Sequence, residues 1–482
     1  LSVLAPIEAS LSVFQRGFRS FVSGVSDCSL LLRTVAGSDR PAAVAFIDIR
    51  NAYNSVQHKA IEGVLERILP HLPAARKVIL SGLCSVSRVE VRNWHSPPFT
   101  TTAGVAQGGA LSPLLFALVI DRAIRRIHER GGGFRVGDAE QVRLSILAFA
   151  DDVVLIAETP EELHQCVCQF EQDLKLIGLS LNESKCGVWM NKFHASQWKG
   201  RLPIVEQYKY LGAIFPSPTR DWTERAVLIA STPFRSRPQA TVEHRLLFAH
   251  RNIVDWRTRR LRSFLWNLHF LNISTTELLN IESLCGEWVL RLLGMNDSAV
   301  EKASKLAAWL ISGGLPLTVM RRLATMRMVE RILSGPRPLP VLQWAVQHDS
   351  SVRALLAANG VPEPSVCCAL SADARRALAY SWSMEVWQAR LSGVPRSLLR
   401  DILTRIPPHL FECKILAVAS RAPRACQAIY SVIEALVGGG TVKVDHVAST
   451  LVCLFRRDST DEEVERAIAT VARTGATSVE TS

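Results

Sequence analysis

Three acidic side chains stand where the sequence predicts that buried β-strands end. Asp48 lies at the end of the apolar run Ala42–Ile49, and the pair Asp151–Asp152 joins two further apolar runs. A carboxylate beside such runs is costly unless it is paired or ligates a cation. If the strands are neighbours in one sheet, Asp48 and Asp151 meet, so a hard divalent ion bridges them or one stays protonated. The alternative for Asp151–Asp152 is a turn that merely favours aspartate.

Mg²⁺ is the ion that suits these oxygen ligands, because it binds one or two carboxylates together with substrate phosphates. Two such ions stabilise the attacking and leaving oxygens of an in-line phosphoryl displacement. With one ion at a primer 3′-hydroxyl and the other at a triphosphate, that chemistry is nucleotide polymerisation. The carboxylates therefore indicate a site for two-metal nucleotidyl transfer.

The elements that would position these carboxylates are predicted within residues 1–215. A continuous apolar run predicts a strand buried on both faces, and two runs joined by a short turn predict a hairpin with the carboxylates at its tip. Pro113 after a serine and the capping pattern at Thr159–Glu162 predict helix starts. The expected strands are 42–49, 88–92, 142–149, 153–157 and 185–190, and the expected helices are 61–69, 113–129 and 160–177.

Seven short motifs follow one another along the chain. Five of them are Phe46–Tyr53, Gln107–Pro113, Phe149–Asp152, Gly178–Lys185 and Tyr208–Gly212, with Gln15–Phe18 upstream and Gly313–Pro316 downstream. In order, the five resemble the palm motifs of reverse transcriptases, and the third has the FADD form typical of non-LTR retrotransposon enzymes. The upstream segment resembles a fingers motif of the same elements, and the downstream one resembles a segment after the thumb. The resemblance is specific over residues 11–215 and looser to about 335. Gly109–Ala110 and Asn54 depart from the family pattern without removing a metal ligand.

The resemblance implies a role for each acidic residue. Asp48 and Asp151 are expected to be catalytic metal ligands, with Asp152 supporting or ligating, and the Ile49 carbonyl is expected to complete the second metal site. Tyr53 is expected to stack under the nucleotide sugar and to crowd a 2′-hydroxyl, which favours deoxynucleotides. For Tyr53 the alternative is an ordinary core aromatic.

The same resemblance implies residues that bind the substrates. Gln107 and Gly108 are expected to line the pocket for the template base and the incoming nucleotide, where glycine lets the backbone approach closely. Lys185 is expected to act on the pyrophosphate as a charge stabiliser or proton donor, and Tyr210 and Gly212 to form a primer grip. The alternatives are a solvated lysine and a simple hairpin.

An arginine-rich helical stretch follows the predicted palm. A thumb helix of this kind would bind the phosphates of the template–primer duplex through Arg251, Arg257, Arg259 and Arg260. A solvated helix face is the alternative. The chain carries 56 Lys and Arg against 44 Asp and Glu, and this net charge of +12 favours an anionic partner, nucleic acid before membrane.

The expected fold class is α+β. We expect a reverse-transcriptase right hand with an antiparallel palm sheet, helices and partial fingers over residues 1–215. An all-helical thumb or linker is expected over 216–335, and a helical C-terminal region of unknown role over 336–482. With 48% hydrophobic and 21% charged residues, a wholly disordered chain is excluded.

The cysteine pattern and the first residues of the chain limit the compartments in which the protein is expected. Eleven scattered cysteines argue against a secreted disulfide framework, and none has the spacing of a zinc site, so zinc is not expected. No signal peptide or spanning segment is predicted, which indicates a nuclear and cytoplasmic protein without a membrane partner. The start at Leu1, close to Gln15, indicates a fragment without the upstream fingers strands.

These patterns together predict an RNA-directed DNA polymerase of a non-LTR retrotransposon. It would use two Mg²⁺ ions, dNTPs, an RNA template and a primer supplied by target DNA. Two alternatives stay open, a catalytically inactive remnant that only binds RNA and an RNA-dependent RNA polymerase. The short fingers favour the first alternative, and Tyr53 argues against the second. The sequence leaves the oligomeric state open.

Overall fold

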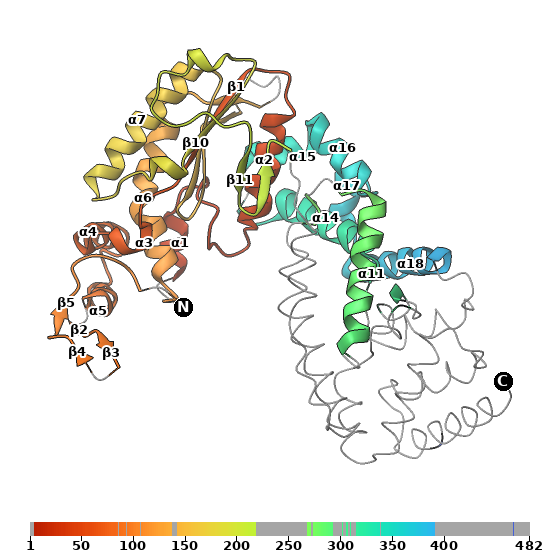
Figure 1. Ribbon diagram of the computed structural model, residues 1–482, viewed down its shortest axis with the longest axis horizontal. Coiled ribbons are helices and arrows are strands. Elements are labelled where there is room, and N and C mark those ends of the chain that lie inside the picture. Colours follow the sequence, from red (N-terminus) through yellow and green to blue (C-terminus); the bar gives the residue numbers. More distant parts are fainter. Residues whose placement is uncertain are drawn as a thin grey trace. The chain divides into compact units, whose positions relative to one another are not determined.

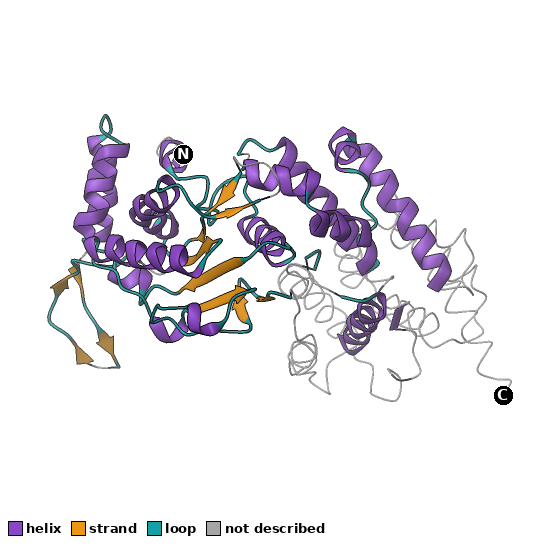
Figure 2. Cartoon of the chain, turned by 90° about the horizontal axis from the view of Figure 1, so that it is seen from above, coloured by secondary structure: helices purple, strands orange, loops and turns teal. Residues whose placement is uncertain are grey.

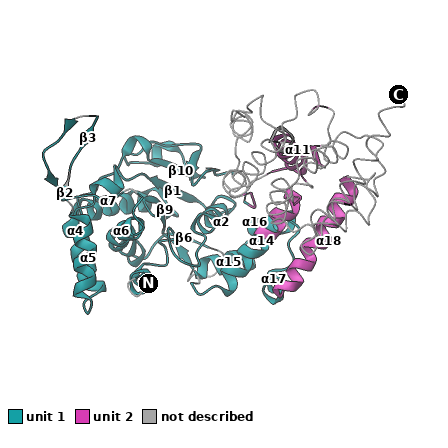
Figure 3. Cartoon of the chain, turned by 90° about the horizontal axis from the view of Figure 1, so that it is seen from below, with its two compact units in different colours: residues 1–220, 270–272, 325–369 teal, residues 221–269, 273–324, 370–482 magenta. Residues whose placement is uncertain are grey.

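The computed structural model describes part of the chain. It covers residues 4–217 (except 85, 93, 107 and 137–141), 268–270, 273–292, 301, 305–306, 309, 315–390 (except 338) and 466. Two compact units are present (Figure 3). Unit 1 comprises residues 1–220, 270–272 and 325–369, and unit 2 comprises residues 221–269, 273–324 and 370–482.

Unit 1 is built around a four-stranded antiparallel sheet with the strand order β10–β1–β9–β8 (Figure 1). The strands are β1 (Ala42–Ile47), β8 (Ile146–Phe149), β9 (Asp152–Ala157) and β10 (Gly187–Asn191). Every residue of β1 is buried, as the continuous apolar run predicted for a strand buried on both faces.

Two helices cover one face of this sheet, α6 (Ser112–Glu129) and α7 (Pro160–Leu176) (Figure 1). Both begin with proline in the first turn, where its missing N–H costs nothing. At the start of α7, the Thr159 hydroxyl accepts a hydrogen bond from the Glu162 N–H at 3.2 Å, so the predicted cap is formed. Apolar residues of both helices therefore close the core on this side.

The other face is covered by α2 (Gly24–Ala36) and by the hairpin of β11 (Tyr208–Tyr210) and β12 (Ala213–Phe215). The ring of Phe46 in β1 stacks on Tyr208 with centroids 4.3 Å apart, and it also contacts Tyr210 and Phe215. The hairpin is thereby fixed to the central strand by aromatic packing.

Shorter elements complete the N-terminal part of unit 1. A two-stranded ribbon projects beside α4 and α5 (Figure 2). In it β2 pairs with β5, and further out β3 pairs with β4. The elements are α1 (Leu4–Ser10), α3 (Ala52–Ser55), α4 (His58–Ile68), α5 (Pro73–Leu83), β2 (Val86–Ser87), β3 (Glu90–Val91), β4 (Trp94–His95), β5 (Phe99–Thr100), β6 (Phe134–Arg135), β7 (Arg143–Leu144), and the 3₁₀ turns η1 (Glu183–Lys185) and η2 (Ala195–Gln197).

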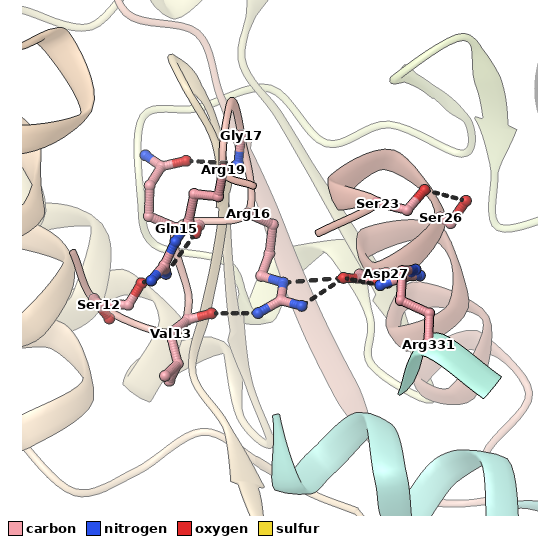
Figure 4. A network of polar contacts seen from close by, with 10 residues as sticks. All are labelled: Ser12, Val13, Gln15, Arg16, Gly17, Arg19, Ser23, Ser26, Asp27 and Arg331. Atoms are coloured by element: carbon pink, nitrogen blue, oxygen red, sulfur yellow. Dashed lines mark hydrogen bonds and ion pairs between the residues drawn. The ribbon is translucent and has the colours of Figure 1, made fainter. Parts of the chain in front are cut away.

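A segment far along the chain returns to unit 1. The helices α15 (Pro340–His348) and α16 (Ser350–Ala358) pack against α2, and α17 (Pro364–Ala369) follows them. Arg331, near the end of α14 (Leu317–Ser334), donates hydrogen bonds to the fully buried Asp27 of α2 (Figure 4). Asp27 also binds Arg16, so one carboxylate joins three segments of unit 1.

The described part of unit 2 is helical. It contains α11 (Thr275–Leu292), the first residues of α14 and α18 (Ala372–Arg390). Glu282 of α11 is fully buried, where it accepts hydrogen bonds from the Arg390 side chain and from the Leu317 N–H. A buried carboxylate requires such partners, so this group holds the three helices together.

The expected α+β class and antiparallel palm sheet are confirmed. Several boundaries differ from the prediction. Asp152 is the first residue of β9 instead of part of the hairpin tip. The strand expected at 185–190 begins at 187, because Glu183–Lys185 form a 3₁₀ turn. Of the strand expected at 88–92 only Glu90–Val91 is extended, as β3, and the strand expected at 142–149 is divided between β7 and β8.

Among the described residues, no helix has the length and hydropathy needed to cross a membrane.

Candidate active site

The strand register brings the predicted acidic residues to one end of the sheet. In the antiparallel pair of β1 and β9, Ile47 lies opposite Val153. Extending this register by one residue sets Asp48 opposite Asp152. In the hairpin of β8 and β9, Phe149 lies opposite Asp152, which leaves Ala150 and Asp151 as a two-residue loop. Residues a hundred positions apart are therefore neighbours.

The electrostatics of the site reflect this proximity. Burial, and then the charge of Asp48, raise the pKa of Asp151 above its ordinary value. Burial, followed by the charges of Asp151 and Asp48, raises the pKa of Asp152 to about 6. Like charges in a partly dehydrated site disfavour ionisation, so a cation placed among these carboxylates would relieve the repulsion.

The backbone beside Asp48 is fixed by a bridge to the segment before β10. The Asn182 N–H donates to the Asp48 carbonyl and the Arg50 N–H donates to the Ser180 carbonyl, both at 2.8 Å. These bonds pair Ile49 with Leu181 without using the carbonyl of Ile49. That carbonyl is therefore free of this bridge, as a metal ligand requires.

The donor set of this site fits a hard divalent cation. It consists of three carboxylates and one backbone carbonyl, all oxygen, from Asp48, Asp151, Asp152 and Ile49. Within the described ranges, no group of three His, Cys, Asp or Glu side chains is already arranged as a metal cage. Mg²⁺ usually takes only one or two protein carboxylates and completes its shell with water and substrate phosphates, so a preformed cage is not required.

Tyr53 lies beside these carboxylates on the short helix α3. Its ring stacks on Phe116 of α6, with centroids 5.0 Å apart and an interplanar angle of 20°. Burial, and then the charges of Asp151 and Asp152, raise the pKa of Tyr53 to about 12. The ring is half-buried, so one part of it packs in the core while the rest remains accessible next to the acidic residues.

Two further residues predicted to bind the substrates are described by the structure. Gly108 has φ of 83°, a left-handed conformation that favours glycine, and the space where a Cβ would stand is open. Lys185 ends η1 and is exposed, and its carbonyl accepts a hydrogen bond from the Tyr208 hydroxyl at 2.7 Å. Gln107 lies outside the described residues.

The predicted primer grip is a tight hairpin turn. Leu211 and Gly212 both have positive φ, 45° and 83°, which is the pattern of a type I′ turn between β11 and β12. The Tyr210 side chain is buried and packs on Phe46, and its hydroxyl lies 3.5 Å from the Asp152 carbonyl. Gly212 is exposed and Leu211 is half-buried, whereas the Tyr210 ring is buried against the sheet.

The four arginines of the predicted thumb helix, Arg251, Arg257, Arg259 and Arg260, lie outside the described residues.

One residue next to the acidic turn had no role in the prediction. Gln15 is fully buried and its side chain binds the backbone of Ala150 in the loop before Asp151. Its motif, Gln15–Phe18, was recognised as a fingers segment, but sequence spacing gives no indication that an amide 135 residues away reaches this turn.

Residues 2–215 match the family described as reverse transcriptase (RNA-dependent DNA polymerase). The curated relatives are more specific. The retrovirus-related Pol polyprotein from type-1 retrotransposable element R2 of Nasonia vitripennis is 36% identical over 190 residues, covering 36% of this chain and 18% of that protein. These matches support a reverse transcriptase domain of the non-LTR retrotransposon type over residues 2–215. Enzymes of this family generally use divalent metal ions, which agrees with the oxygen donors described above.

A second relative supports the same family. The Pol polyprotein from type-2 retrotransposable element R2DM of Drosophila melanogaster is 32% identical over 176 residues, covering 36% of this chain and 16% of that protein. This chain thus spans less than a fifth of either polyprotein. Among solved structures, a telomerase from Candida albicans in complex with a fragment of telomeric RNA is similar. The superposition covers 74% of this chain and 55% of the telomerase chain, with 13% identity and a TM-score of 0.38.

Proposed function

We propose that this chain is an RNA-directed DNA polymerase that transfers a nucleotidyl group from a dNTP to a primer 3′-hydroxyl. The observation that carries the proposal is the register of β1, β8 and β9, which gathers Asp48, Asp151 and Asp152 at one end of the palm sheet. The same residues lie in a domain of the reverse transcriptase family. An acidic cluster with oxygen donors only is the chemistry that nucleotidyl transfer requires.

We propose two Mg²⁺ ions as the cofactors. Asp48 and Asp151 would hold them, with Asp152 supporting or ligating and the Ile49 carbonyl completing the second site. Ions held by these residues would supply activation of the attacking hydroxyl and stabilisation of charge on the leaving oxygens. The chain itself contributes a rigid frame, because Asp48 and Asp152 are attached to strands whose neighbouring residues are buried.

The remaining predicted residues are proposed to bind the substrates. The half-buried Tyr53 would contact the sugar of the dNTP, and Lys185, which is exposed next to the sheet end, would contact its phosphates. Gly108 has no side chain and faces open space, so it would allow the close approach of the nucleotide. Gln107 would line the same pocket. The turn Leu211–Gly212 would contact the primer through its backbone.

The polymer partners belong to the same proposal. An RNA template and a primer from target DNA fit the net charge of +12. The predicted thumb at 216–335, with Arg251, Arg257, Arg259 and Arg260, would bind the duplex, and residues 336–482 would follow as a helical region. We propose that the protein acts in the nucleus and cytoplasm.

Primer extension on an RNA template with dNTPs and Mg²⁺ tests this function. We expect extension by the wild-type chain. Asp151→Asn should lower the extension rate at least a thousandfold (~4 kcal/mol in the activation free energy), because it removes a carboxylate that would hold the ions. Asp39→Asn is the matched control, because Asp39 is an exposed acid before the opposite end of β1. RNA binding without any extension by the wild-type chain would instead support the inactive remnant.

A further inference from the structure

The turn that carries Asp151 is held by a side chain 135 residues earlier in the chain. The Gln15 Oε1 accepts hydrogen bonds from the N–H groups of Ala150 at 2.9 Å and of Gly17 at 3.1 Å. Its Nε2 donates to the Ala150 carbonyl at 3.4 Å. Gln15 is fully buried, so both polar backbone groups of Ala150 are satisfied by one side chain in a site without competing solvent.

This turn needs an external support. Ala150 has φ of 56°, in the left-handed region that costs a residue with a Cβ roughly 1–2 kcal/mol. Such a conformation persists only where the surroundings determine it. Within the two-residue loop, Ala150 immediately precedes Asp151, so a rotation of the Ala150 peptide would redirect the carboxylate of its neighbour.

The segment that contains Gln15 is joined to the edge of the palm sheet. The Ala148 N–H donates to the Phe14 carbonyl at 3.0 Å and the Arg16 N–H donates to the Ala148 carbonyl at 2.7 Å, which forms a parallel bridge beside β8. At Gly17 an added Cβ would lie 2.5 Å from the Ala150 nitrogen. The two backbones are therefore in direct contact.

Buried ion pairs fix this segment from its other side. The Arg16 guanidinium, which is 2% exposed, binds Asp27 at 2.5 Å and donates to the Val13 carbonyl at 3.1 Å (Figure 4). Asp27 is also bound by Arg331 at 2.6 Å. Figure 4 shows Gln15 and Gly17 in the loop beside this network. Gln15 thus acts from an anchored backbone.

We infer that Gln15 is a positioning residue of the polymerase site. By holding both polar groups of Ala150, its amide fixes the orientation of Asp151 and Asp152 toward the divalent ions, without contacting the ions or the substrates itself. The inference rests on the proposed function and adds a residue outside the acidic cluster. It predicts that loss of the amide weakens metal binding even where the sheet stays folded.

A matched control lies at the opposite end of the same sheet. The Asn191 Oδ1 accepts from the Ala42 N–H at 2.5 Å and its Nδ2 donates to the Arg40 carbonyl at 3.2 Å. This amide also supports backbone between two segments, but at the end of β1 that is remote from Asp48. Gln15→Met and Asn191→Leu each remove an amide and keep its approximate volume.

The test measures Mn²⁺ binding by electron paramagnetic resonance, with the full chain, a dideoxy-terminated primer on RNA and the next dNTP. Loss of an outer support around a metal site typically weakens affinity or activity about 10–100-fold. We expect Gln15→Met to raise the Mn²⁺ Kd by about tenfold or more and, in a separate assay with an extendable primer, to lower kcat with little change in KM for dNTP. Asn191→Leu should leave both quantities at the wild-type value, and thermal melting in EDTA reports the stability of each variant.

The outcomes separate this inference from the proposed function. If Gln15→Met and Asn191→Leu change Mn²⁺ binding equally, Gln15 has only a structural role and the inference is overturned. If Gln15→Met loses stability but keeps the wild-type Kd, it is also overturned. If the wild-type chain binds no Mn²⁺ that Asp151→Asn abolishes, and extends no primer, the proposed function fails first and the inference fails with it.

Discussion

The buried ion-pair network around Asp27 gives a quantitative test of how unit 1 is held together. We consider Asp27→Asn, which keeps the shape of the side chain and removes its charge. Asp27 is fully buried and accepts four hydrogen bonds, two from Arg16 and two from Arg331. The variant would leave the guanidinium groups of Arg16 and Arg331 beside a neutral amide. The N–H groups of that amide are donors and cannot accept hydrogen bonds from the guanidinium groups.

The magnitude follows from burial. Arg16 is 2% exposed, so its charge cannot return to water without opening the structure, whereas Arg331 is 21% exposed and can partly rehydrate. Removing one partner of a buried ion pair costs about 3–5 kcal/mol, because the remaining charge is left uncompensated. For a unit of this size, each kcal/mol corresponds to roughly 2–4 °C in melting temperature. We therefore expect Asp27→Asn to lower the melting temperature of unit 1 by roughly 6–20 °C.

Thermal unfolding followed by circular dichroism measures this effect in the full chain. The control is Glu363→Gln, which breaks the exposed pair with Arg353 and should cost less than about 1 kcal/mol. If Asp27→Asn melts within about 2 °C of the control, the network contributes little net stability and the reasoning from burial is wrong. In that case α14 would be attached to α2 mainly by apolar packing.

Two further substitutions test the acidic end of the sheet. Gly17→Ala should abolish extension, because the new Cβ would lie 2.5 Å from the Ala150 nitrogen and 3.0 Å from the Phe149 carbonyl carbon. The control is Gly63→Ala in α4, whose new Cβ meets nothing within 4 Å and which should leave extension unchanged. Equal activity of the two variants in the primer-extension assay would contradict the close contact. Tyr53→Ala should raise the incorporation of ribonucleotides relative to deoxynucleotides, measured as the ratio of kcat/KM values, and an unchanged ratio would leave Tyr53 as a core aromatic stacked on Phe116.

Sequence patterns predicted the elements that are governed by local rules. The apolar run at 42–49 gave β1, the Ser-Pro pattern gave α6, and the Thr159 cap gave α7. Helix α2 was not predicted, although it lies between the Gln15–Phe18 motif and β1 and its buried residues include Leu30 and Leu31. Its role depends on contacts with α15 and α16, more than 300 residues later, which no local pattern reports.

The sequence by itself predicted Asp48, Asp151 and Asp152 as site residues, because its motifs resemble those of a reverse transcriptase palm and because acidic residues that suit a divalent ion follow strand-forming runs. Tertiary structure alone decided which residues support them. The register sets Asp48 opposite Asp152, and Gln15 reaches Ala150 across the sheet edge. The physical reason is that apolar periodicity is a local property of the chain, whereas a buried amide or ion pair acquires its partner only when distant segments pack together.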